Sequence, residues 1–171
     1  MSGFSLVELM ITIVIFSIAT SYGVSSFRTW TQNTQIRNAA ESIQNGLMRA
    51  RAEAVKRNTA VAFVLGANSS WKVDVVGGVQ VDARGSNEGS RNVTATVAPS
   101  GATTVTYNSF GLVINNAMVG GAIPPTITAI DLNSSVLDSA RSLKIELSSP
   151  GGNVRMCDPN LAKGNPQACY P

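Results

Sequence analysis

An almost uninterrupted apolar segment near the N-terminus constrains the fold more than any other feature of the sequence. From Phe4 to Phe27 the only charged side chain is Glu8. As an α-helix this segment would be roughly 36 Å long, enough to cross the hydrocarbon core of a bilayer. It lacks the basic start and the clear small-residue cleavage site of a conventional secretory signal. We therefore expect a membrane-spanning helix.

The apolar pattern continues past this segment but becomes periodic. Apolar residues recur every three or four positions up to about Lys56, which predicts one apolar stripe along a helix. A helix over residues 4–56 would be about 80 Å long. Its first half needs lipid or other helices around it, and its second half needs a folded domain along the stripe. Trp30 lies where either an interfacial anchor or a packing residue is expected. The stripe consists of Ile36, Ala40, Ile43, Leu47, Ala50 and Ala54.

After Asn58 the chain has the pattern of short β-strands separated by turns rich in glycine and proline. Several short strands at this spacing predict antiparallel sheets. We therefore expect the α+β class, with the long N-terminal helix packed on a C-terminal antiparallel β domain and a loop over residues 112–125. The expected strands cover residues 60–65, 71–76, 79–81, 92–97, 103–107, 126–132, 142–147 and 154–157.

Histidine is absent, which excludes catalysis through a histidine base and zinc sites built on imidazole. The ten acidic residues are scattered and form no paired, glycine-framed site. We therefore expect no enzymatic activity, no metal and no cofactor. Six basic and two acidic side chains lie within residues 28–57, and we interpret this excess as a solvated helix face.

Two cysteines, Cys157 and Cys169, lie close together near the C-terminus. Their spacing is not that of a redox motif, and two cysteines without histidine do not complete a four-ligand zinc site. A disulfide is the expected state, with two free buried thiols as the alternative. Closing so short a loop would stabilise the fold by about 3 kcal/mol and would persist in an oxidising compartment.

Glu8 needs a partner that the neighbouring sequence does not supply. An ionised carboxylate in a membrane segment costs a few kcal/mol unless it meets a cation. Residues 1–27 contain no basic side chain. Cleavage after Gly3 would create an α-amino group on Phe4, about one helical turn from Glu8. The two groups could pair within one chain or between neighbouring chains.

The stretch GFSLVEL, which begins at Gly3, resembles the processing site of type IV prepilins and of the pseudopilins of type II secretion. The resemblance implies that prepilin peptidase cuts after Gly3 and methylates the new N-terminal Phe4, and that Glu8 guides assembly into a filament. It also implies a single pass through the bacterial inner membrane, a periplasmic head, and later transfer to a pilus or pseudopilus. Two features depart from the usual pattern. The leader has no basic residue, and Ser25 stands where major pilins often have proline.

Further stretches resemble the GspH/FimT group, which includes the secretion pseudopilin H and the minor pilins FimT and FimU. These are the end of the long helix at residues 47–58, a strand and glycine turn at 105–111, and a closing hairpin at 150–157. The resemblance implies a pilin-like fold. The implied parts are a leader (1–3), a transmembrane and assembly half of the helix (4–27), an amphipathic half (28–57) and a β-rich head with a C-terminal disulfide loop (58–171).

Three functions follow from this resemblance. The first is a minor pilin of a type IV pilus, whose partners are other pilins, prepilin peptidase and the inner membrane. The alternative is pseudopilin H of a type II secretion system. The third is DNA binding, because some FimT-type pilins bind DNA through a Gly-Arg-x-Arg motif that aligns here with residues 152–155. Only Gly152 and Arg155 match it, with Lys163 as a further cation. Alternatively, Arg155 pairs with Asp158 or a carbonyl and holds the disulfide loop.

Overall fold

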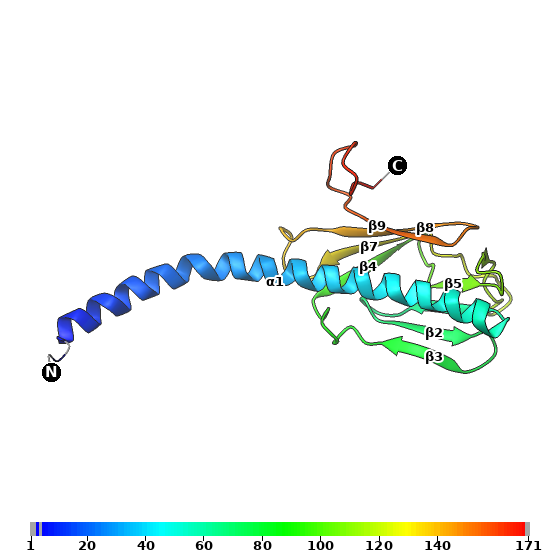
Figure 1. The fold of residues 1–171 in the computed structure, drawn as a ribbon, viewed down its shortest axis with the longest axis horizontal. Helices are drawn as coiled ribbons and strands as arrows, with labels where there is room; N and C mark the ends of the chain where they lie inside the picture. Colours follow the sequence, from blue (N-terminus) through cyan, green and yellow to red (C-terminus); the bar gives the residue numbers. More distant parts are fainter. Residues whose placement is uncertain (1–2, 4, 170–171) are drawn as a thin grey trace.

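One long helix and two antiparallel sheets make up the molecule (Figure 1). The computed structural model describes Gly3 and residues 5–169, without the side chains of residues 21–23. Phe4 lies outside the described residues. Helix α1 covers Leu6–Arg57, 52 residues in all, which confirms the long helix that the apolar pattern predicts.

The end of α1 reverses the direction of the chain. Asn58 adopts the left-handed conformation, with φ 51° and ψ 41°, which asparagine tolerates better than most residues. Its N–H group donates to the carbonyl of Val55 at 3.3 Å. The N–H group of Thr59 donates to the carbonyl of Ala54 at 3.2 Å. These bonds satisfy two of the last helix carbonyls, and the first strand then runs back along α1 from Val61.

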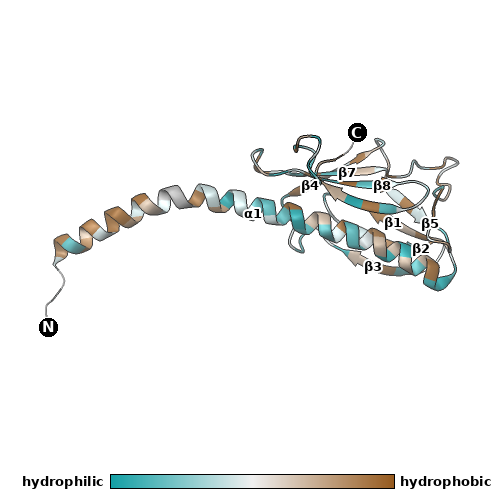
Figure 2. Cartoon of the chain, turned by 45° about the horizontal axis from the view of Figure 1, so that its top comes forward, coloured by the Kyte–Doolittle hydropathy of each residue, from teal (hydrophilic) through white to brown (hydrophobic). Residues whose placement is uncertain are grey.

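The two halves of α1 have different surroundings. Over residues 5–28, every side chain that the structure describes is exposed. This free half is mostly apolar and extends away from the rest of the molecule (Figures 1 and 2). In the second half, the six stripe residues from Ile36 to Ala54 are at most 1% exposed. The periodic part of the pattern is thus the part that packs.

Two antiparallel sheets cover the stripe, and strands of both contact α1. The first sheet has the order β3-β2-β1-β5-β6, and the second has the order β4-β7-β8-β9. The strands of the first sheet are β1 (Val61–Leu65), β2 (Trp71–Val75), β3 (Gln80–Arg84), β5 (Thr104–Tyr107) and β6 (Val113–Ile114). Those of the second sheet are β4 (Val93–Ala98), β7 (Ala129–Ser134), β8 (Leu143–Ser148) and β9 (Asn153–Cys157).

Two segments differ from the expected pattern. The expected loop over residues 112–125 contains the two-residue strand β6, which pairs only with the end of β5. Residues 126–128, expected as the start of a strand, instead cross between the sheets. Thr126 forms an isolated bridge with Thr104 of the first sheet, while the N–H of Thr128 donates to the carbonyl of Ala98 in the second. The crossing depends on contacts with residues more than 20 positions away, while β6 is the short return strand of a hairpin with β5.

The third expected strand also extends further than its apolar residues indicate. Strand β3 continues through Asp82 and Arg84 at the edge of the first sheet. Both side chains are accommodated by ion pairs, with Arg49 at 3.1 Å from Asp82 and Glu88 at 4.0 Å from Arg84. An edge strand tolerates such charged residues because its outer side faces solvent.

Aromatic side chains fill the space between α1 and the first sheet. The rings of Phe63 and Trp71 lie 5.9 Å apart, and the indole nitrogen of Trp71 donates to the hydroxyl of Ser42 at 2.8 Å. Gly46 faces these rings in the middle of the helix. A Cβ atom added there would lie 2.9 Å from Phe63, which is closer than packing allows. The glycine therefore permits this close approach of helix and sheet.

Candidate assembly and processing site

Glu8 lies in the first turn of α1 and is exposed. A carboxylate at this end of a helix is favoured by the helix dipole. Within the part of the chain that the structure describes, no cation forms an ion pair with Glu8. Gly3 is exposed, and a Cβ atom added to it would meet nothing within 4 Å. The proposed cleavage and methylation at Phe4, and the pairing of its amine with Glu8, concern a residue outside the described part.

Three hydroxyl side chains in the free half of α1 donate hydrogen bonds within the helix. The hydroxyl of Thr12 donates to the carbonyl of Leu9 at 2.8 Å. Ser17 and Thr20 donate in the same way to carbonyls one turn earlier, at 2.8 and 2.7 Å. Hydroxyls that bond to their own helix can enter lipid without an unsatisfied donor. Among the described residues, α1 is the only helix long and apolar enough to span a membrane, and its apolar window is unburied.

An aromatic pair marks the end of the free half. The rings of Phe27 and Trp30 lie 5.8 Å apart, and Trp30 remains 64% exposed. Of the two interpretations of Trp30, this exposure favours the interfacial anchor, because a packing residue would be covered by the head. Tryptophan suits the boundary between lipid and water, since its ring is apolar and its N–H is a donor.

Most cations of the second half of α1 are paired with carboxylates. Arg37 pairs with Glu41 at 2.8 Å along the helix. Near its end, Glu53 accepts from Arg57 at 2.6 Å and lies 3.5 Å from Lys56. The hydrogen bond from Arg57 is the main cause that lowers the pKa of Glu53 below its usual value, although desolvation opposes it. The cations of these pairs are exposed, which supports the interpretation of a solvated helix face.

The C-terminal segment is held on β9 by covalent and ionic links. Cys157 and Cys169 form a disulfide, as expected. Their sulfurs lie near a carboxylate oxygen of Glu146, but disulfide sulfurs are not the thiolates that bind metals. Asp158 is almost fully buried and forms an ion pair with Arg141 at 2.5 Å. The segment after β9 is thus fixed by the disulfide and by the ion pair of its first residue, Asp158.

The three residues considered for DNA binding lie in different surroundings. Nη2 of Arg155 donates to the carbonyls of Ala168 and Pro166, at 2.8 and 3.3 Å. The structure therefore agrees with a carbonyl partner for this side chain, while Asp158 is bound by a different arginine. Gly152 is buried before β9, against the ring of Tyr107. Lys163 is exposed in the loop that follows the other end of that strand.

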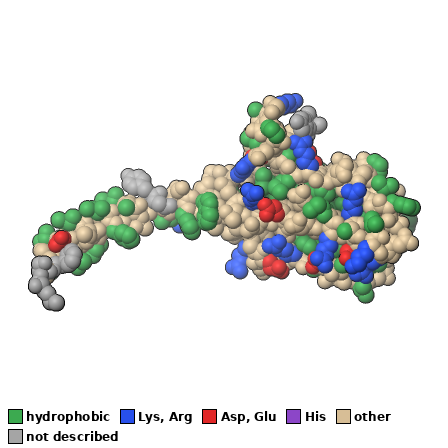
Figure 3. Space-filling model, in the orientation of Figure 1, with side chains coloured by type: hydrophobic (Ala, Val, Ile, Leu, Met, Phe, Trp, Pro, Cys, Tyr) green, Lys and Arg blue, Asp and Glu red, His purple; other side chains and the backbone are tan. Residues whose placement is uncertain are grey.

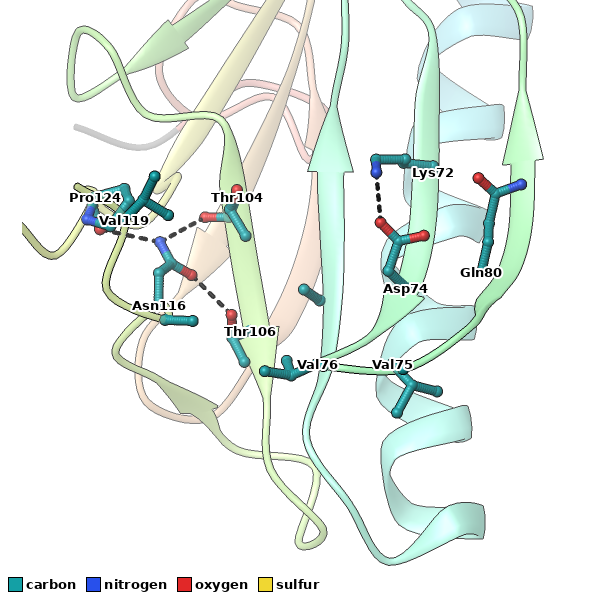
Figure 4. A pocket seen from close by; sticks show the side chains of 14 residues that line it. Lys72, Asp74, Val75, Val76, Gln80, Thr104, Thr106, Asn116, Val119 and Pro124 are labelled. Carbon is teal, nitrogen blue, oxygen red and sulfur yellow. Dashed lines mark hydrogen bonds and ion pairs between the residues drawn. The ribbon is translucent and has the colours of Figure 1, made fainter.

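A hollow of about 480 Å³ lies on the outer face of the first sheet (Figure 4). Sequence reasoning did not identify it, because its residues meet only after folding. Lys72 and Asp74, both on β2, pair at one side of it at 2.6 Å. Asn116 accepts from the hydroxyl of Thr106 at 2.9 Å and donates to the carbonyl of Pro124 at 3.1 Å. The bonds of Asn116 hold the segment after β6 on the sheet.

Tyr107 is another feature that the sequence did not single out. Its ring is fully buried beneath Gly152, and its hydroxyl has no hydrogen-bond partner among the described residues. Burial raises the pKa of Tyr107 to about 12, although the nearby guanidinium of Arg51 acts in the opposite direction. The alternation of threonine with Val105 and Tyr107 in the sequence of β5 predicts that the ring is buried, but it does not predict a hydroxyl without a partner.

Comparison with known proteins gives two family matches and two structural matches. Residues 1–22 match the prokaryotic N-terminal methylation motif. The type IV minor pilin FimU of Pseudomonas aeruginosa strain PAO1, in space group P21, is 21% identical with a TM-score of 0.52. That alignment covers 82% of this chain and 99% of FimU. The crystal form of FimU in space group P65 is 20% identical, with a TM-score of 0.48. That alignment covers 78% of this chain and 99% of FimU. Comparison with curated protein sequences gives no significant match.

The fold, a long helix packed on antiparallel sheets, is therefore that of FimU. The model of the type II transport protein GspH matches residues 39–161, which is more than half of the chain. This region includes both sheets and most of the buried stripe, while the methylation motif covers the start of the free half of α1. The chain therefore belongs to the GspH family of pilin-like proteins.

Proposed function

We propose that the protein is a minor pilin, a structural subunit of a type IV pilus. The observation that carries this proposal is the free half of α1, which is apolar on all sides, bears one carboxylate and continues without a break into the packed half. Such a surface is stable in lipid or among similar helices but not in water. A pilin uses the two environments in turn, first in the membrane and then in the filament.

The proposed parts follow from this use. Residues 1–3 are a leader that prepilin peptidase removes, and Phe4 becomes a methylated N-terminus. Residues 4–27 hold the subunit in the inner membrane, with residues 28–57 and the head 58–171 in the periplasm. An oxidising periplasm is where a disulfide such as that of the C-terminal loop persists. Packing against other pilins then transfers the first half of the helix from lipid to the filament.

Within the filament, Glu8 pairs with the α-amino group of Phe4, in its own chain or in a neighbour. The physical reason is the cost of an unpaired carboxylate at low dielectric, which a single cation offsets. Mass spectrometry of protein isolated from cells tests the first step. We expect a chain that begins with methylated Phe4, and a chain that still begins with Met1 would contradict the proposal.

The second test separates membrane insertion from assembly. Glu8→Ala should leave the protein in the membrane fraction but reduce its incorporation into filaments about tenfold or more, as judged by immunoblots of sheared pili. Glu41→Ala is the matched control, because it removes a carboxylate of the same helix that pairs only on the exposed face. Equal incorporation of both variants would refute the role of Glu8.

The family description favours a second candidate, a pseudopilin of type II secretion, which is built by the same physics. Deleting the gene distinguishes the two functions. Loss of surface pili with normal export of secreted enzymes supports the minor pilin, and the reverse result supports the pseudopilin.

DNA binding is a third candidate that rests on Arg155 and Lys163, but two carbonyls already accept from Nη2 of Arg155, which leaves fewer of its donors for phosphate. A mobility shift that weakens with salt and with Lys163→Ala would support it.

A further inference from the structure

A cleft of about 360 Å³ lies at the end of the head next to the free half of α1. One wall is α1 itself, and the other walls come from the loop between β7 and β8, from β8 and from the C-terminal segment. That loop lies beside α1, because the N–H of Arg141 donates to the side chain of Asn33 at 2.8 Å. Figure 1 shows the loop at this end of the head. The cleft is lined by Trp30, Asn33, Thr34, Arg37, Arg141, Leu143 and Gln167.

The α1 wall of the cleft continues along the helix into the apolar segment. Residues on one face of a helix recur every three or four positions. Four residues with this spacing join the apolar segment to the cleft: Phe27, Trp30, Thr34 and Arg37. The rings of Phe27 and Trp30 lie 5.8 Å apart on this face. Over about 15 Å the face changes from aromatic rings to a hydroxyl and then to a guanidinium group. A lipid has the same order of groups, from apolar chain to polar head.

The depth of the cleft also matches that of lipid headgroups. In the proposed function, on which this inference rests, residues 4–27 cross the inner membrane. The polar layer of each leaflet is about 5–8 Å thick. Trp30 and Asn33 follow Phe27 by about 5 and 9 Å along the helix axis. The end of the cleft at Trp30 therefore lies within the headgroup layer.

The cleft carries positive charge. Its ionisable residues are Arg37 and Arg141, and no carboxylate of the described residues lines it. Figure 3 shows Lys and Arg side chains on the head next to the free half. An arginine has five N–H donors. Arg37 uses its Nε for Glu41, while Arg141 uses its Nε for Asp158 and one Nη2 donor for Gln167. In the described part of the chain, both guanidinium groups therefore keep donors for a phosphate.

We propose that this cleft binds the headgroup of an anionic phospholipid from the periplasmic leaflet. The phosphate accepts from Arg37 and Arg141, and the glycerol region lies against Trp30. An acyl chain lies against Phe27 in the membrane. Guanidinium groups suit this role because their paired N–H donors match the oxygens of a phosphate. Two cations without a carboxylate in the lining disfavour the ammonium group of a zwitterionic lipid. The lipid thereby holds the head on the membrane until the subunit enters a filament.

The test uses the full-length chain, extracted from cell membranes in a neutral detergent. Native mass spectrometry counts the lipids that stay bound during titration with phosphatidylglycerol or with phosphatidylcholine of the same acyl chains. We expect one retained phosphatidylglycerol per chain and about tenfold or more weaker binding of phosphatidylcholine. Glycerol phosphate, which lacks acyl chains, should not displace the lipid at equal concentration, because it cannot use the aromatic part of the face.

Matched arginine variants locate the binding. Arg37→Gln should weaken the binding of phosphatidylglycerol at least fivefold. The head should keep its fold, since the ion pair of Arg37 with Glu41 lies on the exposed face of α1. Arg28→Gln is the control, and it should change the binding less than twofold. Arg28 is an exposed arginine near the same boundary, but it points about 100° around the helix from Phe27 and does not line the cleft.

Three outcomes would overturn the inference. They are equal retention of the two lipids, displacement by glycerol phosphate at equal concentration, or a loss in Arg37→Gln no greater than that in Arg28→Gln. The proposed function fails in a different way. A chain found in the soluble fraction of cells contradicts the membrane segment, whereas a membrane-bound chain without lipid preference contradicts only the lipid site.

Discussion

The two halves of α1 share one backbone conformation but have opposite surroundings. In the free half, apolar residues follow one another without a period and all described side chains are exposed. In the packed half, apolar residues recur every three or four positions, and those of the stripe are buried. The comparison shows that the spacing of apolar residues, more than their number, indicates which medium will cover a helix.

Substitutions of isoleucine test this comparison most strongly. Ile43→Ala in the packed half should lower the free energy of unfolding of the head by about 2–5 kcal/mol, because it leaves a cavity between α1 and both sheets. Ile13→Ala in the free half should leave that free energy unchanged, since Ile13 is exposed. Denaturant unfolding of the full chain in detergent measures both. Equal losses would contradict the division of the helix.

Reduction of the disulfide is expected to have the next largest effect. The loop between Cys157 and Cys169 spans a sequence separation of 12, for which loop-closure entropy gives about 3 kcal/mol. Cys157→Ala with Cys169→Ala should lower the melting temperature of the head. The membrane association of the free half should not change. Intact mass should rise by two hydrogens when the native chain is reduced, and an unchanged mass would refute the bond.

A glycine substitution tests how closely the packed half of α1 lies against the first sheet. Gly46→Ala should destabilise the head by about 1–3 kcal/mol, because the new methyl group meets Phe63 and Trp71. Asn45→Ala, at the exposed neighbouring position, should be neutral or slightly stabilising because alanine has the higher helix propensity. Thermal unfolding of the two variants gives the comparison. A stable Gly46→Ala variant would show that the helix can move away from the sheet.

The smallest predicted effect concerns Tyr107, which lies under the packed half. Its pKa is raised to about 12 in the folded state. The contribution of the neutral phenol to the free energy of unfolding is therefore complete below pH 10 and is lost as the pH rises towards 12. Tyr107→Phe should remove this part of the alkaline sensitivity. At neutral pH it should be neutral or stabilising by up to about 1 kcal/mol, because the buried hydroxyl has no partner among the described residues. Fluorescence of Trp71 against pH measures the change, and equal alkaline midpoints for native and variant chains would contradict it.

The sequence predicts the helix and most strands because both depend on local periodicity. The stripe from Ile36 to Ala54 is buried as predicted. In contrast, the crossing at residues 126–128 depends on which distant strand each residue meets. No local pattern records that choice. The same reason explains Gly46, whose role becomes visible only when two aromatic rings pack against it.

The candidate site was predictable to a different degree in each part. The motif at Gly3 and Glu8 can be recognised because processing acts on a short continuous stretch. At the C-terminus, the sequence leaves Arg155 a choice between a carboxylate and a carbonyl. The structure assigns the carboxylate of Asp158 to Arg141, 17 positions earlier, so Arg155 bonds to carbonyls.

The length of the buried stripe has a mechanical consequence for a subunit in a filament under tension. From Ile36 to Ala54 the contacts between helix and sheets extend over about 27 Å along the helix axis. A pull on the free half acts parallel to this seam, so that all of its contacts resist sliding together. A head attached only at one end of its helix would instead peel away, one contact after another. The proposed filament can thus carry load through its helices without unfolding its heads.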